Sequence, residues 1–317
     1  MTNVYPADLA EAGARLFLGW FGHHYARSTV VSGSESDGRI ARASVTVGRQ
    51  WSLSATVLNT FAASADVAWE AGRSAIESRL DTAGLAGGVW VPRGARLPAA
   101  EPHLSAFVLA REEAQPITDG RLELRRPVTL HLRRTGTTGS VVTVLGGLAA
   151  HWAQFTNRVP GSYQLNATEL YRLPASEGER SEVAERIVLA ASQPTADESQ
   201  RIGATDCWTV SPEPDERAVV FGSPRAENDE GSAALRRELR SLLKDAGSAP
   251  GAAADARALV VLGGATYAEE EKLSWALRGA DPTLYSAFDL LVVIADGVVK
   301  PLLQPGRGAL PWDAPLP

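Results

Sequence analysis

Apolar residues recur at helical spacing in the first part of the chain and predict two helices. The first follows Pro6 and runs to about Tyr25, with a line of residues formed by Leu9, Gly13, Leu16, Trp20 and His24. The second runs over Asp66–Ala83, and Gly84 supplies its stop. Between them, the Ser- and Gly-rich stretch Ser32–Gly38 predicts a loop.

The middle of the chain combines short apolar runs with turn residues. Val128–Arg133 and Ser140–Leu145 flank the sequence TGTTG, which predicts two antiparallel strands joined as a hairpin. Apolar residues at steps of three and four then predict a helix over Gly147–Arg158. A further helix over residues 176–192 opens with the capping pattern Ser176-x-x-Glu179.

Strands and helices alternate in the last third of the chain. The predicted elements are a strand over Ala218–Phe221, a helix over Ser232–Ala246, a strand over Ala258–Leu262, a helix opened by Thr266-x-x-Glu269, and strands over Leu290–Ile294 and Val298–Leu303 joined by the turn Asp296-Gly297. This order predicts a small sheet whose first strands are parallel and whose last two form a hairpin.

A polar stretch rich in proline, residues 193–216, separates these two patterns. We therefore expect an α+β N-terminal domain over residues 1–205, with the antiparallel hairpin and several helices. A linker follows over 206–213, and then a smaller α/β domain over 214–317 with the order β-α-β-α-β-β.

Composition narrows the class of protein. The chain has 317 residues, 44% of them hydrophobic, and a single cysteine, which excludes a disulfide framework and a multi-cysteine zinc site. The GxSxG, HExxH, GxxxxGK[ST] and GxGxxG patterns are absent. We expect no cofactor and no metal, and the absence of these motifs leans against an enzyme.

The chain has no long apolar run and no secretory signal, so we expect a cytoplasmic protein with no membrane contact. The scarcity of lysine indicates a bacterial source.

Charge is distributed unevenly along the chain. Residues 1–174 carry three more basic than acidic residues, whereas residues 175–317 carry nine more acidic than basic ones. Six arginines and one acid, Glu123, lie between Gly120 and Pro160. This asymmetry predicts an electropositive surface in the middle of the chain.

That basic segment is the first candidate site. Its predicted nucleic-acid-binding residues are Arg125, Arg126, Arg133 and Arg134 on the hairpin and His151, Gln154 and Arg158 on one helix face. Arg133 and Arg134 point to opposite faces of a strand, so the four hairpin arginines cannot all meet one ligand. The alternative is that these residues are solvated strand ends and an ordinary polar helix face. The resulting hypothesis is a non-catalytic accessory subunit of a bacterial multiprotein system, binding nucleic acid here and a protein partner through its acidic half.

Two glycine segments that follow predicted strands are the second candidate site. An enzyme or sensor could bind a nucleotide or another small anion there through Gly222, Ser223, Arg225, Gly263, Gly264 and Thr266, because helix N-termini at strand ends attract anions. Acidic residues in the first loop, Glu227 and Asp229 among them, oppose phosphate binding. A third hypothesis is a protein–protein scaffold, which exposed tryptophans would reveal.

Two further patterns are weaker evidence for a catalytic site. Asp289, Asp296 and Lys300 resemble the carboxylates and lysine of a metal-dependent nuclease, but Val298 stands where such a site needs an acid. Cys207 has no basic neighbour in sequence, which predicts an unreactive thiol.

Overall fold

The computed structural model describes residues 8–61, 66–146, 158–193, 199–212, 217–224, 232–248, 253–306 and 309–313. The chain divides into two compact units, which are described separately. Unit 1 comprises Met1–Val108, Asp119–Arg121 and Thr209–Pro317, and unit 2 comprises Leu109–Thr118 and Leu122–Trp208. The chain passes from unit 1 into unit 2 within helix α3 (His103–Glu112). It returns to unit 1 for residues 119–121, at the short 3-10 helix η1 (Thr118–Gly120), and then enters unit 2 a second time at Leu122.

Unit 1 is built around a six-stranded sheet. In spatial order its strands are β1 (Thr29–Ser36), β2 (Ile40–Val47), β3 (Trp51–Asn59), β11 (Ala256–Leu262), β12 (Leu290–Ala295) and β13 (Val298–Leu303). The three central strands are parallel, and Val260 of β11 pairs with Val57 of β3 and Val292 of β12. All three of these valines are fully buried, as expected for parallel strands that are covered on both faces.

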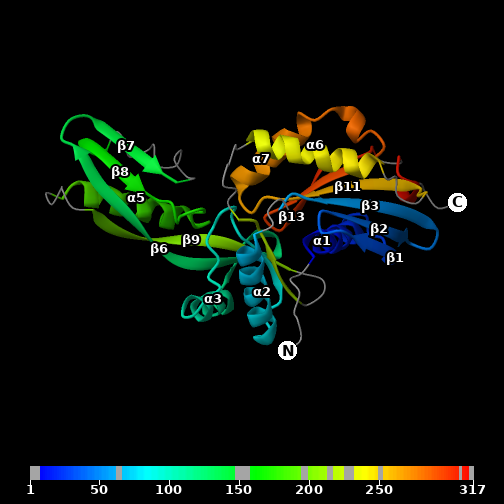
Figure 1. Cartoon of the computed structure of the whole chain (residues 1–317), viewed down its shortest axis with the longest axis horizontal. Helices are drawn as coiled ribbons and strands as arrows, with labels where there is room; N and C mark the ends of the chain where they lie inside the picture. The colour runs from blue at the N-terminus through cyan, green and yellow to red at the C-terminus, as the bar shows by residue number, and fades with distance from the viewer. Residues whose placement is uncertain are drawn as a thin grey trace. The chain divides into compact units, whose positions relative to one another are not determined.

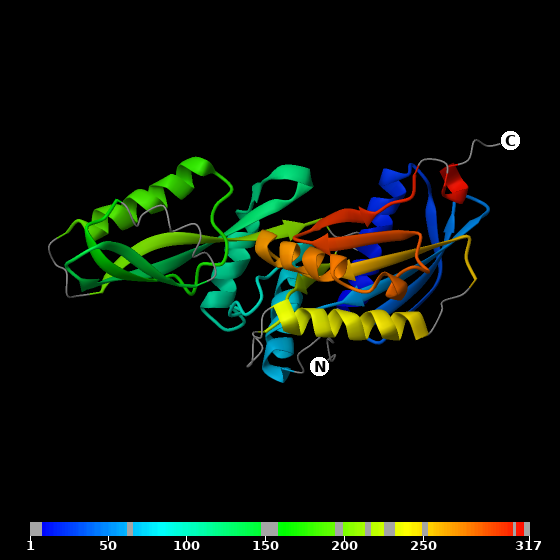
Figure 2. The ribbon, with the colours of Figure 1, turned by 90° about the horizontal axis from the view of Figure 1, so that it is seen from above.

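Helices cover both faces of this sheet (Figures 1 and 2). Helix α1 (Leu9–His24) packs Phe17 and Phe21 on one face, and the Asp8 carboxylate accepts the Ala10 and Glu11 amides at its start. Helices α6 (Ser232–Ser248) and α7 (Tyr267–Arg278) cover the other face. Two short 3-10 helices follow, η3 (Pro282–Leu284) and η4 (Pro311–Asp313).

A second group of strands in unit 1 lies beside α1. Strand β10 (Ala218–Phe221) runs parallel to β4 (Gly87–Trp90), and β4 pairs with the last residues of β9 (Gln200–Ser211). Helix α2 (Val67–Thr82) closes the free edge of β10, because Asp81 and Glu77 accept the Ala218 and Val220 amides. Those amides are therefore not available to pair with another strand.

Unit 2 has its own core and contains the remaining strands of the seven-stranded sheet to which β10 and β4 also belong. Its strands are the first part of β9, β6 (Leu122–Gly136), β8 (Gly161–Asn166) and β7 (Ser140–Leu145), and the short β5 (Gln115–Pro116) also pairs with β6. Helix α5 (Glu177–Ala191) packs Val183 and Ile187 against Leu130, Leu132 and Leu165 of the sheet.

Most predicted helices and C-terminal strands are confirmed, but the predicted hairpin pairing is wrong. The two predicted strands correspond to β6 and β7, yet β8 lies between them, antiparallel to β6 and parallel to β7. A strand's apolar pattern indicates that it is half-buried but does not name its neighbour. The predicted helix over 147–158 lies outside the described residues except for Arg158.

The structure also partitions the chain differently from the sequence prediction. Residues 206–211, expected in a linker, belong to β9, where Cys207 and Trp208 are buried. The predicted loop over Ser32–Gly38 is mostly strand, since β1 extends to Ser36. Strands β10 and β11, expected as neighbours, lie in different sheets, and β11 instead joins β3 of the N-terminal part. Among the described helices, none combines the length and apolar character that crossing a membrane requires.

Candidate functional site

The predicted basic surface is largely neutralised within unit 2. Arg125 forms one ion pair with Glu123 and another with Glu179, which lies in the first turn of α5. The sequence predicts that Ser176 and Glu179 cap this helix. The Ser176 side chain makes no cap hydrogen bond, and the Glu179 carboxylate pairs with Arg125. The pKa of Arg125 is raised because its interactions with Glu179 and Glu123 outweigh the effect of desolvation.

Arg126 is half-buried in a different internal cluster. Its guanidinium lies 4.1 Å from the ring centroid of Trp208 and 3.8 Å from the fully buried carboxylate of Asp206. The same carboxylate accepts the Tyr171 and Arg172 amides at 2.9 and 3.0 Å and the Trp208 indole N–H at 2.8 Å. Burial raises the pKa of Asp206 and lowers the pKa of Arg126, so each charge depends on the partners around it. Arg126 therefore stabilises unit 2 rather than facing a ligand.

The remaining predicted residues have separate surroundings, and two of them lie outside the described residues. Arg158 pairs with Glu185 at 2.7 Å on the surface, and Arg134 donates to the Gly136 carbonyl oxygen. Arg133 is exposed on the sheet face opposite α5. His151 and Gln154 lie outside the described residues. The structure thus does not bring the predicted arginines together.

A different polar surface lies on the face of the unit 2 sheet that α5 does not cover. Strand registers place His131 opposite Asn166 and Arg133 opposite Gln164, while Leu132 and Leu165 point to the core. By the same alternation this face, called the open face below, consists of Arg201 and Gly203 from β9, His131 and Arg133 from β6, Ser162, Gln164 and Asn166 from β8, and Val141, Thr143 and Leu145 from β7. All of these are exposed except Ser162 and Gln164, which are half-buried.

The chemistry of the open face differs from that of the whole chain. None of its ten residues is acidic, although the chain has a formal net charge of −6. The side-chain oxygen of Asn166 accepts from the Thr168 amide and hydroxyl, so the amide group that remains is a donor. Arginine, amide and histidine side chains on a flat sheet can donate to phosphate oxygens and to base edges.

The glycine segments of unit 1 are explained by close packing. A Cβ on Gly263 would lie 2.0 Å from Thr60 Oγ1, and one on Gly222 would lie 3.0 Å from the Val91 carbonyl oxygen. Gly264 has a φ of +87°, which favours glycine. Ser223 is buried against this region, with its carbonyl oxygen accepting the Gly94 amide. Arg225 lies outside the described residues.

A carboxylate of the protein itself occupies the start of α7. Thr266 caps the helix as predicted, and the buried Glu269 carboxylate accepts the Ala265 and Arg93 amides at 2.8 and 2.9 Å. An anionic ligand at this helix start would have to displace Glu269. The small pocket beside it, about 60 Å³, is lined by residues that include Thr60, Arg93, Lys272 and Leu235.

Desolvation raises the pKa of Glu269 above the usual carboxyl value of 4.5, which predicts a pH dependence of stability. Above about pH 4.5 the unfolded chain releases this proton before the folded protein does, so ionisation lowers the free energy of unfolding as pH rises. Urea unfolding between pH 4 and pH 8 should show this decline reduced in Glu269→Gln and unchanged in the exposed control Glu271→Gln. An identical pH profile for all three proteins would contradict the assignment.

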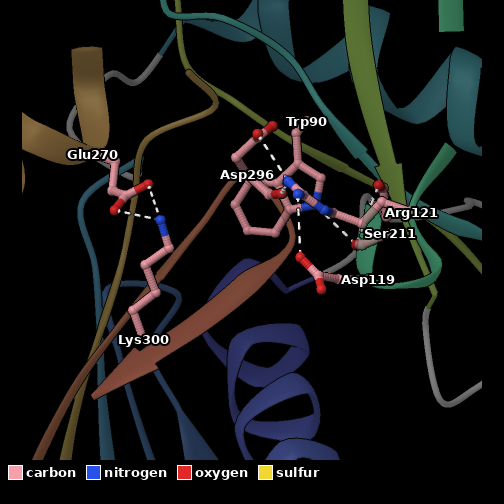
Figure 3. Close-up of polar contacts among 8 residues, drawn as sticks. Trp90, Asp119, Arg121, Ser211, Glu270, Asp296 and Lys300 are labelled. Atoms are coloured by element: carbon pink, nitrogen blue, oxygen red, sulfur yellow. Dashed lines mark hydrogen bonds and ion pairs between the residues drawn. The ribbon is translucent and has the colours of Figure 1, made fainter. Parts of the chain in front are cut away.

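The residues resembling a nuclease site are held by separate partners. Asp296 binds Arg121 at 3.1 Å and Lys300 binds Glu270 at 2.7 Å (Figure 3), while the Asp289 carboxylate accepts the Arg257 amide. Among the described residues, no group of three histidine, cysteine or acidic side chains is arranged to hold a metal ion.

The same close-up shows what these contacts do in unit 1. The turn Asp296-Gly297 at the end of β12 lies against the last residues of β9, where Ser211 accepts the Trp90 indole N–H at 2.8 Å (Figure 3). A Cβ on Gly297 would lie 2.6 Å from the Ser211 Cβ. Arg121 donates to both the carbonyl and the carboxylate oxygens of Asp296, and the carboxylate of Asp119 lies 3.6 Å from it. These interactions fasten the β12–β13 turn within unit 1.

Cys207 is buried, and desolvation raises the pKa of its thiol to about 12. The thiol therefore stays protonated at neutral pH, in agreement with the sequence prediction that it is unreactive.

Three comparisons with known proteins add no further assignment. No family model, curated protein or solved structure is significantly similar to the chain. Of the ten open-face residues, Arg133 alone was predicted from the sequence, and the polar side chains that were missed include His131, Gln164, Asn166 and Arg201. The two-residue spacing of Ser162, Gln164 and Asn166 indicates a strand with one polar face. The sequence does not show which strands lie beside it, because that depends on the order of strands in the sheet.

Proposed function

We propose that this protein is non-catalytic and binds single-stranded nucleic acid on the open face of unit 2. The observation that carries the proposal is that none of the ten described residues of that face is acidic, in a protein with net negative charge. A binding surface for a polyanion must keep its own acids elsewhere, and here they are used to neutralise Arg125, Arg126 and Arg158.

The shape of the surface favours single strands over duplexes. Bases of a single strand can lie against a sheet and offer their edges to Gln164, Asn166 and His131, whereas reading a duplex requires an element that enters a groove. None of the ten described residues of the open face is phenylalanine, tyrosine or tryptophan, so we expect phosphate contacts and hydrogen bonds to contribute more to affinity than stacking on large rings. Val141 and Leu145, which are 53% and 42% exposed, offer apolar contact to sugars and bases.

The experiment is a titration of fluorescent dT20 and rU20 oligonucleotides followed by anisotropy at several salt concentrations. We expect a dissociation constant of about 1–100 µM at low salt that weakens as salt rises, as for electrostatic binding without sequence preference. Arg133→Glu or Arg201→Glu should weaken binding about tenfold or more, because each removes a charge-assisted contact and adds a repelling carboxylate.

Arg158→Glu is the matched control. It changes the net charge by the same amount in the same unit, but its partner is the surface residue Glu185 rather than the open face. Equal losses in Arg133→Glu and Arg158→Glu would show that only overall charge matters. Absence of any complex at low salt would refute the proposed function.

A further inference from the structure

Helix α6 carries a stripe of basic residues, although the C-terminal half of the chain has a net negative charge. Its four basic residues, Arg236, Arg237, Arg240 and Lys244, are all exposed. At about 100° per residue they fall within an arc of roughly 100° on the side away from the sheet. Leu239, Leu242 and Leu243 occupy the adjoining side of the helix, which is buried in the core.

The neighbouring helix adds two large exposed aromatic side chains. Tyr267 is 73% and Trp275 is 66% exposed, and their eight-residue spacing places both on the outer side of α7. The two helices lie side by side on the same sheet face (Figure 2), with Leu235 of α6 and Lys272 of α7 lining one small pocket. Tryptophan, tyrosine and arginine are the residues that contribute most at protein interfaces.

We propose that this α6–α7 surface, comprising Arg240 and Lys244 of α6 and Tyr267, Glu271 and Trp275 of α7, docks an acidic segment of a partner protein. Carboxylates of the segment would pair with Arg240 and Lys244, and its apolar or aromatic side chains would cover Trp275 and Tyr267. This inference is independent of the open face, since every residue of the surface belongs to unit 1. It also reverses the sequence expectation that the C-terminal half offers acidic groups to its partner.

One residue of the surface favours a protein over nucleic acid. Glu271 lies one turn from both Tyr267 and Trp275 and is exposed. Its carboxylate would repel a phosphate backbone that stacked its bases on those rings, whereas a protein segment can place a basic residue opposite it. The mixture of cations, one carboxylate and two aromatic rings therefore fits a polypeptide ligand.

The test uses a fluorescently labelled random copolymer of glutamate and tyrosine, which supplies carboxylates and aromatic rings without phosphate. The full-length protein should bind it in a salt-dependent manner and more tightly than polyglutamate. Trp275→Ala should weaken binding about fivefold or more, and the double variant Arg240→Glu, Lys244→Glu about tenfold or more. Because these side chains are exposed, the variants should unfold at the temperature of the parent protein.

Arg133→Glu is the control that separates the two proposals, and it should leave copolymer binding unchanged. The docking proposal is overturned if the copolymer does not bind at low salt, or if the α6 and α7 variants bind it as the parent does. It is equally overturned if Trp275→Ala abolishes binding of dT20, which would make this a nucleic-acid surface.

Discussion

Replacement of Asp206 by alanine should lower the free energy of unfolding by about 3–5 kcal/mol, the largest effect expected of any single change in unit 2. The Asp206 carboxylate accepts hydrogen bonds from the Tyr171 and Arg172 amides and from the Trp208 indole. Its removal takes the carboxylate acceptor away from those three donors and the counter-charge away from the Arg126 cation. Urea unfolding followed by far-UV circular dichroism measures the loss.

Two companion variants show which interaction is lost. Asp206→Asn keeps an oxygen acceptor and should cost less than Asp206→Ala. Glu185→Ala, which removes an exposed ion-pair partner in the same unit, should cost about 1 kcal/mol or less. A loss below 1 kcal/mol for Asp206→Ala would mean that Arg126 does not depend on this carboxylate and is free to serve another role.

In unit 1 the largest effect is expected at Arg121, where methionine should cost about 3 kcal/mol or more of unfolding free energy. The side chains of Arg121 and Asp296 are only 12% and 11% exposed, and methionine preserves the length of the aliphatic stem while removing the guanidinium that pairs with the Asp296 carboxylate. Thermal and urea unfolding both report this loss.

Arg158→Met is the matched control for this change, because its ion pair is exposed and should contribute about 1 kcal/mol or less. The double variant Arg121→Met, Asp296→Asn should recover part of the stability, since it removes the unpaired charge. No recovery, together with an equal loss in the control, would exclude the buried pair as the source of the effect.

Local sequence signals predicted the helices and much of unit 1. The Thr266 cap, the Leu290–Ile294 strand and the Asp296-Gly297 turn are formed by residues close together in sequence, so their patterns are decisive. Strand partners are not local. Strand β9, a neighbour of β6, and strand β3, a neighbour of β11, are each separated from their partner by more than 60 residues of sequence, and the apolar pattern of a strand fits several partners equally well.

The candidate site was harder to predict for the same reason. Arginines that are consecutive in sequence, Arg125 and Arg126, meet different acids, and those acids come from α5 and β9. The polar side chains of the segment that contains Asp206 predicted a linker, but this segment forms the buried second half of β9. Whether a basic residue faces solvent or an internal acid depends on this long-range pairing, which sequence charge alone does not reveal.

The central claim is that nucleic acid lies on the open face of unit 2, and site-specific quenching tests it most directly. Cys207 is buried and protonated, so an introduced cysteine can be labelled selectively. A fluorophore at Thr143→Cys on the open face should be quenched by dT20 carrying a quencher, whereas one at Ser241→Cys on α6 should not. Quenching at Ser241→Cys alone, or at neither position under conditions where the oligonucleotide binds, would contradict the account.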